Sequence, residues 1–299
     1  MYNGIINIYK EAGFTSHDVV AKMRGILKQK KIGHTGTLDP EAVGVLPVCL
    51  GSGTKLCDVL TDHSKEYEAV LLLGVSTDTQ DTTGAVLQER EVNCTEKEVQ
   101  SAVMSFVGEY DQIPPMYSAL KVDGKKLYEL AREGKEVERA ARRVVIENIF
   151  VEKIELPRVV MRVECSKGTY IRTLCHDIGE KLGCGGAMES LKRTRVGQFE
   201  AADAITLTQL EKLRDEGCVQ EKVMAVDAFF AELPAVHIKE EFTVLIQNGN
   251  AFGKQHATEP QHCKAGNKIR VYDSTGKFYG IYEFDEQRRR MKPWKMFLN

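Results

Sequence analysis

The stretch Gly33-His34-Thr35-Gly36-Thr37-Leu38-Asp39-Pro40, continuing as Glu41-Ala42-Val43-Gly44-Val45-Leu46-Pro47-Val48, is the most unusual local sequence in the chain. Pro40 restricts Asp39 to an extended backbone, and the glycines permit tight turns and the close approach of a ligand. One carboxylate is therefore displayed on a preformed loop beside an apolar run. Taken alone, an aspartate in such a loop is more often a turn residue or a helix cap than a catalyst.

A second segment, residues 165–174, reads Cys-Ser-Lys-Gly-Thr-Tyr-Ile-Arg-Thr-Leu. The pattern predicts the end of a strand at Lys167-Gly168 and a helix that Thr169 can cap. Arg172 then lies in the first helical turn, where the helix dipole favours anions rather than cations. Such an arginine has either a specific anionic partner or an ordinary place on the surface.

Three further segments carry residue types suited to binding. Tyr67 stands early in a predicted strand, where a core or edge tyrosine is the commoner use. Residues 113–121 contain two prolines and form a stiff, extended segment that ends in Lys121. Residues 191–197 place three cations within four positions, a spacing suited to phosphates, and Arg193 is the central one.

The charge of the 299-residue chain is balanced overall but segregated along its length. It has 41 basic and 43 acidic residues, a net charge of −2, which taken alone lowers the odds of a nucleic-acid partner. Residues 61–115 hold 11 acidic and 3 basic groups. By contrast, residues 116–200 hold 13 acidic and 17 basic groups, and residues 235–299 hold 7 acidic and 11 basic groups. We therefore expect one basic face that includes the Asp39 loop.

Composition also limits the class of protein. Eight scattered cysteines without a Cys-x-x-Cys pair form neither a disulfide framework nor a zinc signature, so we expect reduced thiols. The chain shows no apolar run long enough to span a membrane and no signal peptide at its start. We expect a cytoplasmic protein.

The hydrophobic patterns predict an α+β fold with a mixed, largely antiparallel sheet. Thr15 and Thr95 each stand three residues before an acid and predict capped helices. Strands are predicted over residues 5–8, 67–74, 84–88, 144–154 and 159–165, and the strands over 67–74 and 84–88 are expected to pair. Helices are predicted over residues 16–27, 96–106, 125–132 and 170–182, and a loop over residues 32–40. A boundary near Leu233-Pro234 predicts two domains, residues 1–233 and a small β-rich module of residues 234–299.

These motifs, in this order, resemble those of the TruB family, the bacterial tRNA pseudouridine synthases, which isomerise the T-loop uridine at conventional tRNA position 55. The resemblance covers almost the whole chain. It runs through residues 4–10, 13–16, 33–48, 65–67, 114–121, 168–172 and 191–194. The chain has Lys10-Glu11 where the family usually has Lys-Pro. The tail from about Ala235 looks like a PUA module, a small RNA-binding domain.

The resemblance implies a pseudouridine synthase catalytic domain and a set of site residues. Asp39 matches the catalytic aspartate, Arg172 the arginine that pairs with it, and Tyr67 a tyrosine that stacks on uracil and serves proton transfer. The residues expected to contact the substrate are His34, Tyr67, Tyr170, Leu191, Lys10, Lys121 and Arg193. The reaction detaches uracil from C1′ and rejoins it through C5 after flipping the nucleotide out. Nothing is oxidised, so we expect no metal and no cofactor.

Three other functions are compatible with parts of this pattern. A non-catalytic RNA-binding or tRNA-folding protein needs only the basic segments and the tail. A base-removing hydrolase usually pairs two carboxylates, and we see no second acid beside Asp39. Relatives that use a guide RNA carry extensions and basic tails, whereas this chain stops at Asn299. We therefore expect a monomer that uses no guide RNA and binds the T stem-loop, with the tail on the acceptor end of the tRNA.

Overall fold

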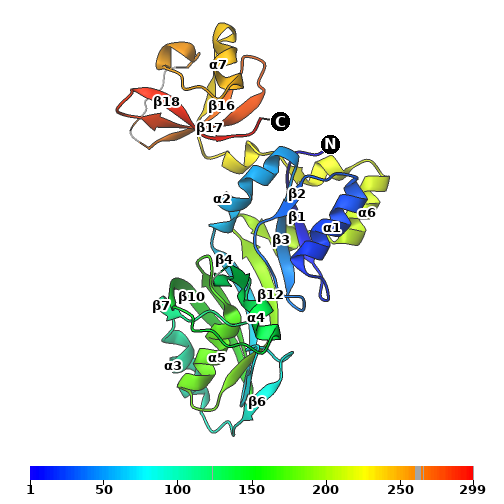
Figure 1. Ribbon diagram of the computed structural model, residues 1–299, viewed down its shortest axis with the longest axis vertical. Helices are drawn as coiled ribbons and strands as arrows, with labels where there is room; N and C mark the ends of the chain where they lie inside the picture. Colours follow the sequence, from blue (N-terminus) through cyan, green and yellow to red (C-terminus); the bar gives the residue numbers. More distant parts are fainter. Residues whose placement is uncertain (123, 260–263, 265, 299) are drawn as a thin grey trace.

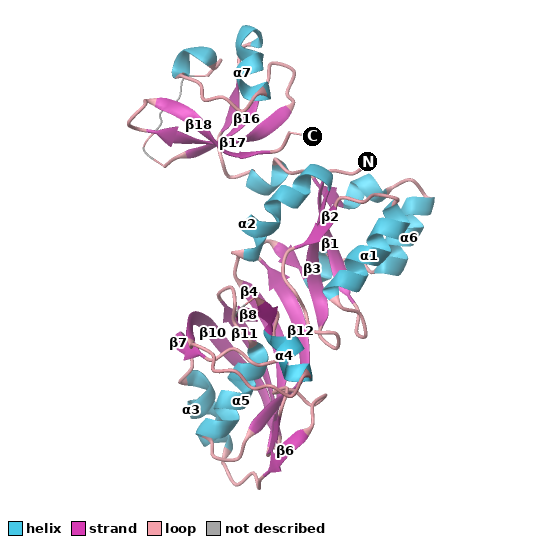
Figure 2. Ribbon diagram, viewed as in Figure 1, coloured by secondary structure: helices cyan, strands magenta, loops and turns pink. Residues whose placement is uncertain are grey.

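The computed structural model describes residues 1–122, 124–259, 264 and 266–298, so Cys263 and Asn299 lie outside the described residues. The chain forms an elongated molecule with the C-terminal segment at one end (Figure 1). Helices cover parts of a long sheet in the rest of the molecule (Figure 2). Among the described residues, no helix has the length and apolar character needed to cross a membrane. The seven described cysteines are free thiols.

The main sheet has ten strands and carries most of the chain. Eight of them follow the order β14-β1-β3-β12-β4-β11-β10-β7, while β2 pairs with β3 and β13 with β12. The strands are β1 (Gly4–Lys10), β2 (Ile32–His34), β3 (Val43–Leu50), β4 (Lys65–Leu73), β7 (Gly108–Gln112), β10 (Arg142–Glu155), β11 (Arg158–Cys165), β12 (Gly186–Val196), β13 (Phe199–Glu200) and β14 (Val223–Met224). The pairings described between these strands are antiparallel, apart from parallel β3 and β12. The predicted α+β class with a mixed, largely antiparallel sheet is confirmed.

The helices begin where the sequence provides caps. The seven α-helices are α1 (Ser16–Leu27), α2 (Cys57–Thr61), α3 (Glu96–Met104), α4 (Leu127–Arg132), α5 (Ile171–Lys181), α6 (Leu207–Asp215) and α7 (Thr243–Gln247), counted within the described residues. Reciprocal capping boxes from Thr15 and Thr95 start α1 and α3, as predicted. The predicted Thr169 cap of α5 is wrong, because its hydroxyl donates to the Ser166 carbonyl at 3.0 Å and Tyr170 is the N-cap.

Three other local predictions are corrected by the structure. Residues 67–74 were expected to pair with residues 84–88, but β4 lies between β12 and β11. Strand β6 (Val86–Glu89) pairs instead with β5 (Val75–Thr77), since β4 ends at Leu73 and the chain turns back over residues 78–85. The predicted loop over 32–40 contains β2, and residues 125–126 form β9 (Lys125–Lys126), paired with β8 (Lys121–Val122). The long central strand β12 was not predicted, because its polar second half hid the strand pattern.

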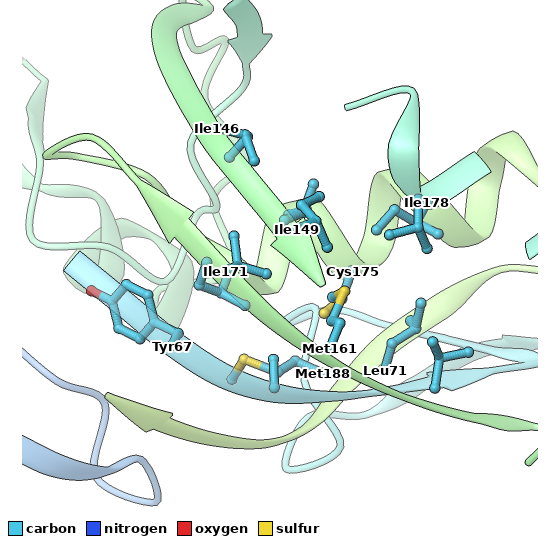
Figure 3. Packing of buried hydrophobic residues seen from close by; sticks show 14 of the residues in the cluster. Tyr67, Leu71, Ile146, Ile149, Met161, Ile171, Cys175, Ile178 and Met188 are labelled. Atoms are coloured by element: carbon cyan, nitrogen blue, oxygen red, sulfur yellow. The ribbon is translucent and has the colours of Figure 1, made fainter. Parts of the chain in front are cut away.

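Two apolar layers hold helices against the main sheet. One cluster packs α3 and α5 on the β4–β11–β10 part of the sheet and includes Tyr67, Leu71 and Ile178, among others (Figure 3). Another packs α1 and α6 on β1 and β3, with Met23 and Leu46 fully buried. The Asp39 loop lies in the chain between β2 and β3. It is near the point where the half of the sheet covered by α3 and α5 meets the half covered by α1 and α6.

The two halves of the sheet meet at the parallel contact between β3 and β12. Lys192 lies opposite Val43, and Arg193 lies opposite Gly44. Gly44 has φ +107°, and a Cβ at this position would come within 2.2 Å of the Arg193 carbonyl oxygen. The contact therefore requires glycine at residue 44.

The C-terminal segment forms its own sheet in the order β15-β16-β17-β18. These strands are β15 (Ala235–His237), β16 (Lys268–Tyr272), β17 (Phe278–Asp285) and β18 (Arg290–Met296). The segment has a separate apolar core, but a further cluster joins its Ile281 and Phe297 to Leu56, Leu60 and Phe230 of the rest of the chain. Lys295 pairs with Asp58 across the same contact. The C-terminal sheet is thus anchored by both apolar and ionic contacts.

Replacing Gly44 with Ala is expected to lower the free energy of unfolding by more than about 2 kcal/mol, since strain and a backbone clash act together. Gly217→Ala is the matched control. Gly217 also has positive φ, +75°, but a Cβ there would meet open space. Chemical denaturation of the two variants measures the difference, and equal losses would contradict the proposed close contact.

Candidate active site

The loop that carries Asp39 is held in place by buried polar contacts. The Lys10 ammonium donates to the carbonyl oxygens of Glu11, Pro40 and Ala42 at 3.1, 2.8 and 2.5 Å. The Thr35 hydroxyl donates to the Pro47 carbonyl at 3.1 Å. The Leu38 amide donates to the hydroxyl of Ser16 at 2.9 Å, which ties the loop to the start of α1. These contacts fix the backbone on both sides of Asp39.

Asp39 and Arg172 form a two-point ion pair. Arg172 Nε lies 3.0 Å from Asp39 Oδ2, and Arg172 Nη2 lies 3.2 Å from Oδ1. The arginine side chain is 6% exposed, whereas the aspartate side chain is 39% exposed. The carboxylate can therefore be reached from solvent while its partner is locked in the protein. This contact confirms that the arginine in the first turn of α5 has a specific anionic partner.

The remaining polar atoms of Arg172 are also occupied. Nη1 donates to the Thr79 carbonyl at 3.1 Å, and Nη2 donates to the Tyr117 carbonyl at 2.8 Å. Asp81 Oδ2 lies 3.7 Å from Nη1 on the far side of the guanidinium. These contacts come from the segment between β5 and β6 and from the proline-rich segment. Arg172 therefore joins three loops at one point.

Asp81 is a site residue that the sequence analysis missed. Its Oδ1 accepts hydrogen bonds from the hydroxyls of Thr79 and Thr83 and from the Thr83 amide. The expectation that no second acid stands beside Asp39 is wrong, because Asp81 shares its arginine. The only sequence signal was an Asp within a Thr-rich turn, and that pattern is common in ordinary turns.

Burial and pairing act in opposite directions on Asp39. Burial raises the pKa of its carboxyl, the Arg172 guanidinium lowers it, and the charge of Asp81 raises it again. The net shift is upward. Arg172 counters the desolvation of the carboxylate without fully offsetting it.

Tyr67 and Leu191 lie on neighbouring strands beside the loop. Tyr67 is 8% exposed and belongs to the same apolar cluster as Leu38 (Figure 3). Burial raises the pKa of its hydroxyl, while the adjacent Arg193 guanidinium lowers it. Leu191 is partly buried against that cluster, opposite Ala69 of β4. Both residues therefore stand close to the backbone that presents Asp39.

The other predicted contact residues occupy distinct positions. His34 ends β2, its ring lies 5.5 Å from that of His17 edge to face, and burial lowers its pKa. Tyr170 is half-buried just before α5, and burial raises the pKa of its hydroxyl. Lys121 is exposed at the start of β8. These three side chains are placed where a substrate could reach them.

Two predicted substrate contacts are contradicted by burial. Lys10 is 0% exposed with its ammonium on three carbonyls, and burial lowers its pKa to about 8. Arg193 is 1% exposed, and it donates from Nε to the Val45 carbonyl at 2.7 Å and from Nη2 to the Gly36 carbonyl at 3.3 Å. Both cations hold loops together rather than contacting substrate. The family resemblance placed Lys10 among the substrate contacts, and charge spacing also suggested Arg193, but neither signal reveals that a charge is buried.

Within the described ranges, no group of three or more His, Cys, Asp or Glu side chains is arranged to hold a metal ion. The arrangement around Asp39 is one accessible carboxylate, one locked guanidinium and an apolar wall. It suits attack on, or proton removal from, a neutral ring held against that wall.

The pH dependence of catalysis by Asp39 follows from its ion pair with Arg172. Replacing Arg172 with Lys is expected to move the acid limb of kcat/KM to higher pH and to lower kcat at least about tenfold. A lysine keeps one charge but loses the two-point geometry, so the pKa of the Asp39 carboxyl rises further. Initial rates between pH 4 and 8 measure this. An acid limb at the wild-type position, in a variant that unfolds at the wild-type temperature, would contradict the role of Arg172.

Comparisons with known proteins agree over nearly the whole chain. Residues 24–171 match the sequence model of the TruB family pseudouridylate synthase N-terminal domain. Residues 172–231 match that of the tRNA pseudouridylate synthase B C-terminal domain. The tRNA pseudouridine synthase B of Lachnoclostridium phytofermentans is 54% identical over 99% of this chain and 100% of its own length. The tRNA pseudouridine synthase B of Alkaliphilus oremlandii is 47% identical over 90% of this chain and 89% of its own length.

Solved structures share the fold. An H/ACA RNP bound to a substrate RNA containing 2′-deoxyuridine includes a chain with a TM-score of 0.73 and 26% identity. The alignment covers 99% of this chain and 85% of that one. A Cbf5-Nop10-Gar1 complex includes a chain with the same TM-score and coverage and 28% identity.

Proposed function

Since the chain belongs to the TruB family and is a tRNA pseudouridine synthase, we propose that it isomerises the T-loop uridine at conventional tRNA position 55 and that Asp39 acts on the nucleotide. The observation that carries this assignment is the two-point pair between accessible Asp39 and buried Arg172. Such a pair presents one ionised carboxylate at a fixed angle. The chemistry of pseudouridine formation needs that group.

Each chemical route to glycosidic bond cleavage needs Asp39 in its ionised form. Attack at C1′, addition to C6 of uracil and removal of the 2′ hydrogen all use an electron pair of the carboxylate. The net upward shift in the pKa of Asp39 makes this electron pair more basic. Arg172 keeps it available at neutral pH by opposing protonation.

Neighbouring residues hold the flipped nucleotide and the freed base. We assign Tyr67 to the face of the uracil ring and to proton transfer at C5, with Leu191 as part of the pocket wall. His34 occupies the space that the flipped base leaves in the T loop, where unstacking costs a few kcal/mol. Tyr170 and Lys121 contact the surrounding nucleotides. The support for the roles of His34, Tyr67, Leu191 and Tyr170 is their position around the Asp39 loop, and that for Lys121 is its exposed position at the start of β8.

Hydrolysis of the base is the competing chemistry, because Asp81 supplies a second acid. Asp81 is 13% exposed, and one of its oxygens accepts three hydrogen bonds from threonines. Its other oxygen faces Arg172. The carboxylate is therefore committed to the protein and is poorly placed to activate water. We assign Asp81 to holding Arg172.

Replacing Asp39 with Asn is expected to reduce pseudouridine formation in a T stem-loop RNA at least about 10⁴-fold, since the amide cannot supply the electron pair. RNA affinity should stay within about threefold, because the substitution is isosteric. Tritium release from C5-labelled uridine measures the reaction, and filter binding measures affinity. Activity near the wild-type rate would refute the assignment, and free uracil among the products of the wild type would indicate hydrolysis.

We propose that residues 1–233 perform the chemistry and that residues 234–299 form a PUA-like domain that binds the acceptor end of the same tRNA. The turn between β17 and β18 carries Arg288 and Arg289, and Arg290 follows as the first residue of β18; all three are exposed. Three neighbouring cations on a turn suit a phosphate backbone. With recognition residing in the protein, the enzyme works as a cytoplasmic monomer and without a guide RNA.

Replacing all three arginines of this turn with Ser is expected to raise KM for full-length tRNA about tenfold, with kcat within about twofold, because phosphate contacts bind ground state and transition state alike. The salt dependence of binding should also become shallower. Lys212, Arg214 and Lys222 are also exposed but lie in an acidic segment, and their replacement by Ser is the control. Equal effects of the two triple variants would argue against a specific contact by the turn.

A further inference from the structure

Gln112 is a buried residue at the end of β7 whose side chain binds the main chain of Tyr170. It is 1% exposed. Its Nε2 donates to the Tyr170 carbonyl at 2.9 Å, and its Oε1 accepts from the Tyr170 amide at 2.8 Å. One carboxamide therefore satisfies both main-chain groups of one residue, as a neighbouring strand would.

Tyr170 is the residue from which α5 starts. Its carbonyl also accepts a helical hydrogen bond from the Leu174 amide at 3.1 Å. A two-point hold on Tyr170 sets both the position and the direction in which the helix begins. Arg172 follows two residues later, within the first turn, so the direction of the helix start determines where its guanidinium lies.

The same segment also reaches Arg172 from the other side. The chain leaves β7 at Gln112, and the carbonyl of Tyr117 accepts a hydrogen bond from Arg172 Nη2 at 2.8 Å. The contacts form a closed circuit from Gln112 to Tyr170, on to Arg172 and Tyr117, and back along residues 113–117. Two prolines stiffen the return path. The circuit limits the movement of the guanidinium relative to Asp39.

We propose that Gln112 is a positioning residue for pseudouridine formation, which keeps Arg172 in the orientation that pairs with Asp39 at two points. This inference rests on the roles proposed above for Asp39 and Arg172. Gln112 acts through Tyr170 and Arg172, and its burial keeps it out of contact with the nucleotide. It couples the proline-rich segment, whose Tyr117 carbonyl binds Arg172, to the ionisation of Asp39.

A role limited to stability has different consequences. Strand β7 is the last strand of the sheet order, so a buried amide there could simply satisfy main-chain groups at the edge. Its loss would then lower the unfolding temperature and leave the ionisation of Asp39 unchanged. The pH profile of the reaction separates the two roles.

The test replaces Gln112 with Met, which keeps the volume and removes both hydrogen bonds. We expect kcat with T stem-loop RNA to fall at least about tenfold while KM changes less than about threefold, because a misplaced arginine affects the reacting geometry. The acid limb of kcat should move to higher pH, since Asp39 loses part of its counter-charge. Gln112→Asn, one methylene shorter, retains an amide and should give a smaller shift in the same direction.

Ile178→Val is the matched control. Ile178 lies on α5, the helix that also carries Arg172. It is 0% exposed and packs in the apolar cluster under β4. Its truncation lowers stability without touching Tyr170, so the acid limb should stay at the wild-type position. Thermal unfolding of every variant is measured, and rates are compared well below the lowest transition.

A Gln112→Met enzyme with the wild-type kcat and acid limb overturns the inference, and so does a loss of kcat that Ile178→Val reproduces. If the Met variant does not fold, the Asn variant provides the same measurements. A wild-type enzyme that forms no pseudouridine in the T loop would instead defeat the proposed function, so the two failures are distinguishable.

Discussion

The buried guanidinium of Arg193 holds together the two halves of the main sheet, and the site depends on that contact. Strands β3 and β12 approach at Gly44, where the backbone of Arg193 leaves no room for a side chain. The arginine side chain then reaches the Val45 and Gly36 carbonyls, one on β3 and one in the Asp39 loop. The same residue pairs with Tyr67 in the register of β12 and β4. A single residue therefore contacts the loop, the strand of Tyr67 and both halves of the sheet.

The site is built from charges that the protein desolvates. Lys10 and Arg193 are buried on carbonyl oxygens, and Arg172 is buried on two carboxylates and two carbonyls. A buried cation is stable only when its donors are satisfied, so each one dictates the path of the loops around it. Asp39 is also partly desolvated, but its side chain keeps an exposed fraction of 39%, against 6% for Arg172. The rigid parts of the site are therefore the ones that hold the reactive group.

Much of the fold could be predicted from the sequence, and the failures have physical causes. Capping boxes at Thr15 and Thr95 depend on residues three positions apart and were predicted correctly. The pairing of β4 with β11 and β12 depends on residues far apart in the chain, so local patterns could not supply it. The pairing of Asp39 with Arg172 was implied by family resemblance, and the structure shows it. Asp81 and Gln112 were missed because their contacts span long sequence separations.

The burial of cations changes what the charge distribution means. The basic excess of residues 116–200 is 17 against 13, but Arg172 and Arg193 within it are inside the protein and face its own carbonyls and carboxylates. Lys10 likewise removes one cation from the surface of residues 1–60. By contrast, Arg288, Arg289 and Arg290 of the C-terminal turn are exposed. Since only surface charge attracts an RNA backbone over distance, the buried cations add little to that attraction, whereas the exposed arginines of the C-terminal segment contribute to it. We therefore propose that the region around Asp39 recognises the tRNA mainly by shape and by contact.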